Sequence, residues 1–348
     1  MTRIAAARGR KRTTRTRGAF AFAATAAVLL ASACGTSTTG APAPIGAAQA
    51  ALPQAAGTPE PGPTPNCGNP ELSLKPPTVL PTSFPDGSFL QHIKSQGYFT
   101  AGVDQSTYPF GYVDPADGRL KGFDVDLLRE IAKAIFGDAN DGRIRFRVLK
   151  NADRVPMVAD GKVDIVAMTM TVDCVRRQKV DFSDVYFRAG QEVLVQKDPT
   201  LPAAVKKQGL AGMTGLRVCA LDGSTSFTRI KQPPFTGIIP VTGDTWADCL
   251  VKLQKGEADG VSTDDTILAG LQAQDPVFTE VIGPPVSQEP YAMAIAKENP
   301  DFVRYVNGVL AKLRADGTWK DLYRKYIGSS LNDADPKPPA VTSWRDQP

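Results

Sequence analysis

The stretch Gly122-Phe123-Asp124-Val125-Asp126-Leu127 opens a segment whose apolar residues recur at helical spacing. The recurring positions, Phe123, Leu127, Ile131, Ala134 and Ile135, predict a helix over Phe123–Phe136. The segments around it alternate between helix and strand patterns: helix Phe89–Gln96, strand Tyr98–Val103, strand Ile144–Leu149, helix Val155–Asp160 and strand Val163–Met168. This alternation predicts a parallel sheet covered by helices, and therefore an α/β fold.

A second unit of the same kind begins near Gly215. Its predicted elements are strands Leu216–Leu221, Ile238–Val241 and Gly260–Ser262, and helices Phe227–Lys231, Trp246–Gln254 and Thr266–Leu271. Extended stretches flank it at Glu192–Gln196 and Tyr291–Ala296, and helices Phe302–Ala315 and Thr318–Ile327 follow. A second α/β lobe is therefore expected inside the first, joined to it by two strand-like crossings.

The positive charge of the chain is concentrated at its N-terminus. Residues 1–33 hold seven Lys and Arg and no acidic residue, so the formal net charge of +4 becomes −3 without them. A mildly acidic body argues against nucleic-acid binding. The single histidine, His92, leaves little for a histidine-based catalytic triad or metal site, and we expect it on the surface of an early helix.

The first 33 residues have the pattern of a secretory signal peptide: a basic run, a short apolar stretch and small residues. Ala31-Ser32-Ala33-Cys34 resembles a bacterial lipobox, in which the cysteine is lipidated and becomes the new N-terminus. Ala31 departs from the branched apolar residue usual at that place. The alternatives are ordinary secretory cleavage nearby and a cytoplasmic protein with a disordered basic tail. The Ala/Pro-rich segment after Cys34 has too few large apolar residues to fold and is expected to be a tether.

Four cysteines remain after Cys34, and an even number in an exported chain suggests disulfides. They are Cys67, Cys174, Cys219 and Cys249, and three pairings are possible. Cys219 ends a predicted strand and Cys249 lies in a predicted helix, and such elements pack together in α/β folds. This favours Cys219–Cys249 and leaves Cys67–Cys174, with a metal site as the alternative.

The stretch at Gly122, with Ile131, Ala132 and Ile135 behind it, resembles the signature of the family 3 bacterial extracellular solute-binding proteins. Further blocks resemble the family in order and spacing: Asp164–Thr171 with Arg176 and Asp181–Ser183, Gly223–Ser226, Ala258–Asp264, and Asp316–Trp319 with Leu322, Tyr323 and Tyr326. The chain is similar in particular to the actinobacterial glutamate- and glutamine-binding lipoproteins. This resemblance implies a periplasmic-binding-protein-like clamshell, in which two α/β lobes close over one free amino acid.

The resemblance also implies the residues that hold the ligand. Arg176 would bind the α-carboxylate, since its planar guanidinium fork matches a carboxylate. Backbone N–H groups of Thr171 and Thr225 would help it. Asp264 would pair with the α-ammonium, with Asp265 as the rival, and the carbonyl of Thr169 would accept from the ammonium.

Side-chain selectivity is implied by Arg154, which matches an arginine used by acidic-amino-acid binders of the family against the distal carboxylate. Asp104, Thr107 and Phe110 follow the first strand, in a loop expected to wall the ligand, although Phe110 fits the core equally well. One departure is Asp173, which stands where the family often has threonine and would repel the ligand unless it points away.

The expected organisation is a signal peptide at 1–33, a lipid-anchored tether at 34–83, lobe 1 at 84–193 and 291–328, lobe 2 at 194–290, and a loose C-terminal tail at 329–348. The expected function is capture of glutamate, aspartate or their amides outside the membrane for the permease and ATPase of an ABC importer. A monomer without metal, cofactor or enzymatic activity is expected. The alternatives are a sensor that presents the amino acid to a membrane signalling partner, and a dehydratase on the same fold.

Overall fold

The helix expected at Phe123–Phe136 is present in the computed structural model as α2, and its start depends on Gly122. Gly122 has a φ of +133°, and a Cβ at this position would lie 2.0 Å from the carbonyl oxygen of Phe110. Only glycine lets the chain pass here. Asp124 and Asp126 occupy the first turn of α2, and Gly137 ends the helix in a left-handed conformation.

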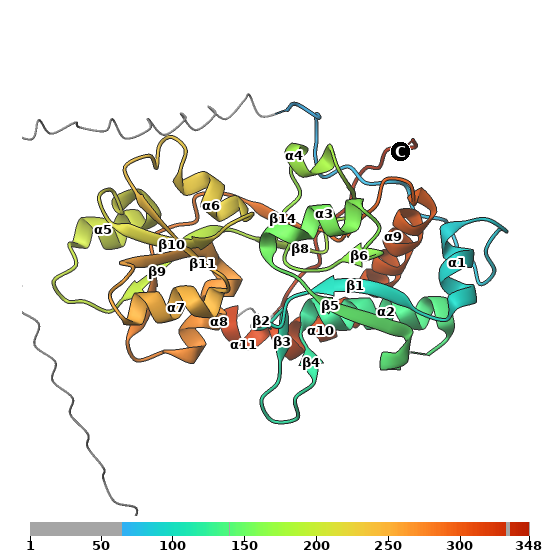
Figure 1. The fold of residues 1–348 in the computed structure, drawn as a ribbon, viewed down its shortest axis with the longest axis horizontal. Helices are drawn as coiled ribbons and strands as arrows, with labels where there is room; N and C mark the ends of the chain where they lie inside the picture. Colours follow the sequence, from blue (N-terminus) through green and yellow to red (C-terminus); the bar gives the residue numbers. More distant parts are fainter. Residues whose placement is uncertain (1–64, 139, 332–334, 348) are drawn as a thin grey trace, which may run out of the picture. The chain divides into compact units, whose positions relative to one another are not determined.

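The structure describes residues 65–138, 140–331 and 335–347 (Figure 1). The signal peptide and Cys34 lie outside the described residues. Two five-stranded sheets define two lobes, and the family-like clamshell fold expected from the sequence is confirmed at this level.

The sheet of lobe 1 has its parallel strands on one side and its antiparallel strands on the other. Its order is β5 (Ile144–Val148), β1 (Phe99–Val103), β6 (Ile165–Val166), β15 (Ala294–Ile295) and β7 (Asp181–Phe182). Strand β1 runs parallel to β5 and β6, whereas β15 is antiparallel to both neighbours. The helices are α1 (Phe89–Gln96), α2, α3 (Arg154–Ala159), α4 (Cys174–Arg177), α9 (Pro300–Ala315), α10 (Thr318–Tyr326) and α11 (Gly328–Leu331).

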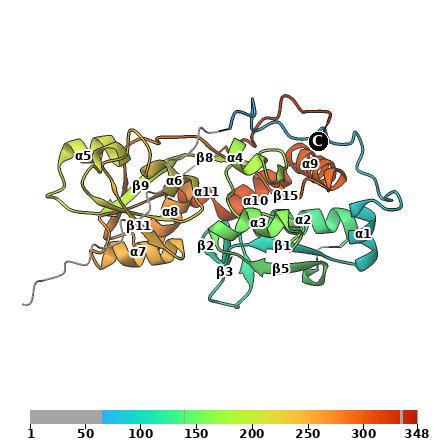
Figure 2. The same ribbon diagram turned by 45° about the horizontal axis from the view of Figure 1, so that its top comes forward.

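Two apolar clusters of lobe 1 involve different helices. The larger joins α1, α2, α9 and α10 to strand β1 through residues such as Phe99, Leu127 and Phe302. The smaller joins α3 to β6 and β7 through Val158, Val166 and Phe182. Figure 1 shows α3 above strand β1 and α2 below it, and Figure 2 shows the same elements turned by 45°. A small sheet of β2 (Ser106–Thr107), β3 (Gly111–Val113) and β4 (Leu120–Lys121), not predicted from the sequence, follows β1.

The sheet of lobe 2 repeats this plan with one apolar cluster. Its order is β11 (Ile239–Gly243), β10 (Arg217–Leu221), β12 (Gly260–Asp264), β9 (Gln191–Gln196) and β13 (Thr279–Ile282). Strand β10 is parallel to β11 and β12, and β9 is antiparallel to its neighbours. The helices are α5 (Ala203–Gln208), α6 (Thr225–Ile230), α7 (Trp246–Gln254) and α8 (Asp265–Gln274).

The crossings between the lobes lie a few residues earlier in the chain than expected. They are β8 (Phe187–Ala189) and β14 (Glu289–Tyr291), which pair antiparallel. Residues from Gln191 onward already belong to the sheet of lobe 2. The sequence pattern located the apolar residues at the ends of these segments. It did not locate the polar residues of the crossings, because a strand that connects two lobes needs no alternation of apolar and polar residues.

The segment ends assigned to a tether and to a loose tail pack on lobe 1. Ser73 and Leu74 are buried, and Leu74 bridges to Arg345 in parallel pairing. Arg345 also forms an ion pair with the buried carboxylate of Asp181, and the Trp344 indole donates to Asp184. These corrections concern 65–83 and 335–347, whose partners lie more than a hundred residues away and leave no local pattern in the sequence.

Two disulfides are present, Cys67–Cys174 and Cys219–Cys249, which is the pairing that the sequence favoured. The first fastens the N-terminal segment to α4, and the second joins β10 to α7 within lobe 2. Within the described ranges, no helix is long and apolar enough to cross a membrane. The same ranges contain no group of three metal-ligating His, Cys, Asp or Glu side chains.

Candidate functional site

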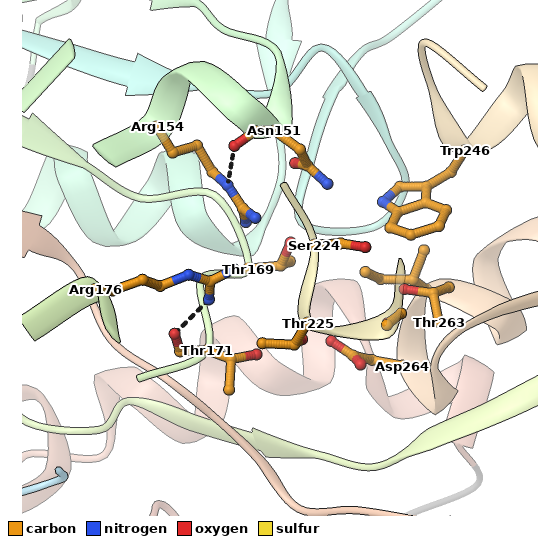
Figure 3. Close-up of a pocket in the computed structure, with 12 residues that line it drawn as sticks. Asn151, Arg154, Thr169, Thr171, Arg176, Ser224, Thr225, Trp246, Thr263 and Asp264 are labelled. Carbon is orange, nitrogen blue, oxygen red and sulfur yellow. Dashed lines mark hydrogen bonds between the residues drawn. The ribbon is translucent and has the colours of Figure 1, made fainter. Parts of the chain in front are cut away.

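A cavity lies where loops from the two lobes meet, and it is lined by residues that follow the carboxyl ends of parallel strands (Figure 3). This edge is where open α/β sheets bind ligands. Lobe 1 contributes Asn151, Arg154, Thr169, Thr171 and Arg176. Lobe 2 contributes Ser224, Thr225, Ser226, Trp246, Thr263, Asp264 and Ile267.

The cavity is nearly filled by its own side chains. Its free volume is about 10 Å³, close to the space that one water molecule needs. A molecule the size of an amino acid can therefore enter only if the lobes separate or the lining side chains move.

Arg176 lies at the end of the short helix α4, with its side chain 10% exposed. Its Nη1 donates to the carbonyl of Thr171 at 2.5 Å and its Nη2 to the carbonyl of Gly223 at 3.1 Å. Burial lowers the pKa of Arg176, and the nearby acids Asp173, Glu289 and Asp264 partly offset this. The guanidinium thus presents a buried positive charge at the cavity.

Asp173 does not point into the cavity, which answers the concern raised by its position in the sequence. It is the N-cap of α4, where its Oδ1 accepts from the backbone N–H of Arg176 at 2.7 Å. Its Oδ2 lies 3.4 Å from Nε of Arg176, and its side chain remains 32% exposed. Asp173 therefore orients Arg176 from outside the site.

Arg154 is also buried, and it enters the cavity beside Arg176 (Figure 3). Three of its N–H groups donate to backbone carbonyls, those of Asn151 at 3.0 Å, Met168 at 3.0 Å and Gly223 at 3.1 Å. Burial first, and then the charge of Arg176, lowers the pKa of Arg154 to about 9. The side chain stays protonated at neutral pH, and two of the five guanidinium N–H groups are left for a ligand.

Asp264 ends strand β12 and faces the two arginines from lobe 2 (Figure 3). Its Oδ2 accepts from the hydroxyl of Tyr291 at 2.5 Å, whereas its buried Oδ1 has no hydrogen-bond partner among the described residues. Burial, together with the charge of Glu289, raises the pKa of Asp264 well above its ordinary value. A buried carboxylate oxygen without a donor is a ready acceptor for a cationic group.

The rival residue, Asp265, does not line the cavity. It opens α8, where its Oδ1 accepts from the N–H of Thr266 and its own N–H donates to the carbonyl of Gly190. The two neighbouring acids therefore have different surroundings, and only Asp264 meets the arginines.

Thr169 and Thr171 present backbone groups from the loop after β6. Thr169 has a φ of +43°, unusual for a β-branched residue, and its N–H donates to the buried carboxylate of Asp124 at 2.8 Å. Thr171 lies opposite Tyr291, and its neighbours Met170 and Val172 bond to the backbone of Ala292 and Pro290, so the N–H and carbonyl of Thr171 point away from that segment. Asp124, in the first turn of α2, thus fixes the backbone of the site from outside the cavity.

Thr225 begins helix α6, whose N-cap is Ser224. The hydroxyl of Thr225 donates to Oε2 of Glu289 at 2.9 Å. Glu289 is fully buried on the crossing strand β14 and also accepts from Arg229 at 3.1 Å. The backbone N–H of Thr225 remains at a helix N-terminus, where anions are favoured.

Three residues of the expected site lie outside the cavity lining. Asp104 folds back on its own turn, accepting from the backbone N–H and hydroxyl of Ser106 and from the hydroxyl of Thr107. Phe110 is fully buried and packs edge-on against Phe123, Phe187 and Tyr291. The structure therefore assigns Phe110 to the core and Asp104 and Thr107 to a turn.

Several lining residues were not singled out in the sequence, among them Asn151, Trp246 and Thr263. Thr263 directly precedes Asp264 on β12, and Ser224 precedes Thr225. In the sequence, only this adjacency to an expected site residue indicated that they line the cavity. Asn151 and Trp246 follow strands β5 and β11, and their position at the carboxyl ends of those strands was the only clue.

Taken together, lobe 1 supplies two buried cations and lobe 2 supplies one buried acid. An α-amino acid carries a carboxylate and an ammonium about two bonds apart, and an acidic one adds a second carboxylate. The charges of the cavity are the complement of that pattern, and no metal is needed to explain them.

The chain is similar to proteins named for the binding of glutamine and of glutamate. The chain is 33% identical over 239 residues to the glutamine-binding protein GlnH of a Bacillus subtilis ABC transporter, covering 68% of this chain and 84% of the relative. It is 27% identical over 219 residues to the glutamate-binding protein GluB of Corynebacterium glutamicum, covering 61% and 72%.

Solved structures agree on the fold. An ancestral arginine-binding protein bound to glutamine is 31% identical with a TM-score of 0.60, covering 67% of this chain and 98% of that one. A receptor for L-cysteine from Neisseria gonorrhoeae is 27% identical with a TM-score of 0.63, covering 70% and 94%. Residues 99–329 match the family model directly, so this chain belongs to the bacterial extracellular solute-binding proteins, family 3.

Proposed function

We propose that this protein captures a free acidic amino acid, or its amide, outside the cell membrane and delivers it to an ABC importer. The observation that carries the proposal is the buried set of opposed charges: Arg154 and Arg176 from lobe 1 facing the unpartnered oxygen of Asp264 from lobe 2. Relatives named for glutamine, glutamate and glutamate/aspartate support the same class of ligand.

In this proposal each charged group has one role. Arg176 binds the α-carboxylate, assisted by the backbone N–H groups of Thr171 and Thr225. Asp264 pairs with the α-ammonium, which also donates to the carbonyl of Thr169. A site that satisfies both charges offsets the cost of taking them out of water.

Arg154 then recognises the end of the ligand side chain. A charge-assisted hydrogen bond contributes about 1.5–3 kcal/mol against roughly 1 kcal/mol for a neutral one. We therefore assign a modest preference for glutamate or aspartate over the corresponding amides, on the order of tenfold.

Export and anchoring complete the proposal. Residues 1–33 act as the signal peptide, and Cys34 carries lipid that holds a monomer at the outer face of the membrane, near the permease and ATPase. Mass spectrometry of the mature protein should find a lipidated Cys34 as its first residue. An unmodified N-terminus at another residue contradicts the anchor without touching the ligand assignment.

Removing the charge of either clamping residue should weaken every amino-acid ligand by a similar factor. Truncating one partner of a buried charge pair typically costs about 2–5 kcal/mol, which is roughly thirty-fold to a few thousand-fold in affinity. Calorimetry on Arg176→Ala and Asp264→Asn, with glutamate and glutamine as ligands, measures it.

The matched control for Asp264→Asn is Asp265→Asn, since Asp265 is adjacent but does not line the cavity. This control should bind within about threefold of the parent. If Asp264→Asn also stays within that range, the ammonium assignment is wrong.

Arg154→Gln should remove the preference for acidic ligands while leaving the binding of amide ligands largely intact. The substituted glutamine side chain keeps hydrogen-bonding groups but loses the positive charge. Titrating the parent and the variant with all twenty amino acids tests both this role and the ligand class. A parent that binds a basic or hydrophobic amino acid more tightly than glutamate, aspartate and both amides contradicts the proposal.

Affinity should fall as the pH is lowered, beginning above the range in which an ordinary aspartate titrates. The pKa of Asp264 is raised, so protons compete with the ligand ammonium for this carboxylate at a higher pH than for an ordinary aspartate. The affinity should fall by at most about tenfold per pH unit. Glutamine is the ligand to use, since its side chain does not titrate. Asp264→Asn should lose this dependence, and a pH profile shared by the parent and this variant assigns the titration to another group.

A further inference from the structure

The two lobes meet backbone to backbone at Gly223. This residue turns the chain after β10 with a φ of +74°. A Cβ placed on it would lie 2.5 Å from the Cα and 2.8 Å from the backbone N of Ala152 in lobe 1. Ala152 lies within the 3-10 turn Asn151–Asp153, directly before helix α3 and Arg154.

The lobes meet in the same manner at Gly270, on helix α8 of lobe 2. A Cβ there would lie 2.0 Å from the carbonyl oxygen of Tyr108, in the small sheet region of lobe 1. Backbone atoms cannot turn aside as the end of a flexible side chain can. At both positions, therefore, a single methyl group is incompatible with this separation of the lobes.

Gly223 also links closure to the charges of the site. Its carbonyl oxygen accepts from Nη2 of Arg154 and from Nη2 of Arg176, each at 3.1 Å. One carbonyl of lobe 2 thus accepts from both cations of lobe 1, and the negative end of its dipole partly offsets their mutual repulsion. When the lobes separate, both guanidinium groups lose this partner.

We propose that Gly223 and Gly270 make two of the contacts that close the clamshell, and that their lack of a side chain sets the affinity for ligand. In this role Gly223 is a positioning residue for Arg154 and Arg176. The inference rests on the proposed amino-acid binding, since closure over a ligand is what the two contacts permit.

Gly270→Ala separates this role from fold stability. Gly270 lies within a helix without a positive φ, and alanine is more favourable than glycine in a helix interior. The variant should therefore keep or raise the stability of lobe 2. Its affinity for glutamate and glutamine should nevertheless fall by at least about tenfold, by the same factor for both.

Gly223→Ala has a matched control in Gly215→Ala. Gly215 is in the same lobe and has a φ of +80°, but nothing lies within 4 Å of a Cβ at that position. In both variants alanine takes a positive φ that it disfavours, and only Gly223→Ala adds the contact with Ala152. We expect Gly215→Ala to bind within about threefold of the parent and Gly223→Ala to bind at least about tenfold more weakly.

The experiment combines calorimetry, thermal unfolding and small-angle X-ray scattering with and without glutamate on the parent and the three variants. The parent and Gly215→Ala should become more compact with glutamate, whereas Gly223→Ala and Gly270→Ala should compact less, with the ratio of glutamate to glutamine affinity unchanged. Parent-like affinity and compaction of Gly270→Ala, or equal affinities of Gly223→Ala and Gly215→Ala, overturn the inference and leave the proposed function intact. A parent that binds no amino acid overturns both.

Discussion

Burial of two like charges, those of Arg154 and Arg176, is the constraint around which the cleft is arranged. A buried guanidinium is costly unless its N–H groups find acceptors and its charge finds a partner. Backbone carbonyls of Asn151, Met168, Thr171 and Gly223 supply the acceptors. They carry no net charge, so the positive potential of the pair remains for a bound anion to neutralise.

Two of the acids near these cations, Asp264 and Glu289, are bonded to the strand that crosses between the lobes or lie on it. Asp264 accepts from Tyr291, and Glu289 accepts from Thr225 and Arg229. Tyr291 and Glu289 are both on β14, which pairs with β8 at the crossing. The part of the site in lobe 2 is therefore bonded to the crossing strand β14. A change in the angle between the lobes at this crossing moves the acids relative to the arginines.

The sequence predicted the regular elements well where local patterns exist. Helices α1, α2 and α7 have the expected bounds, because apolar periodicity defines their length and, for α1 and α2, a glycine marks the end. The family resemblance indicated Arg154, Arg176, Thr225 and Asp264, and the structure gathers them because the carboxyl ends of parallel strands from both lobes converge.

What the sequence did not predict depends on distant partners. The sequence placed Asp104 after β1. It did not predict that the Asp104 carboxylate accepts hydrogen bonds from Ser106 and Thr107, because these bonds depend on the geometry of the turn. The pairing of Leu74 with Arg345 on lobe 1 joins residues that are 271 positions apart in the chain, and no local sequence pattern predicts it. The contact of Gly223 with Ala152 could not be predicted either, since it forms only when the two lobes approach each other.

In the proposed binding mode, one ligand presents a carboxylate to Arg176 and an ammonium to Asp264 at the same time. Calorimetry comparing glutamate with glutarate, which lacks the ammonium, and with γ-aminobutyrate, which lacks the α-carboxylate, tests it most directly. Each missing charge leaves its buried partner unpaired, so both analogues should bind at least about thirty-fold more weakly than glutamate. Binding of either analogue within about threefold of glutamate would rule out this binding mode.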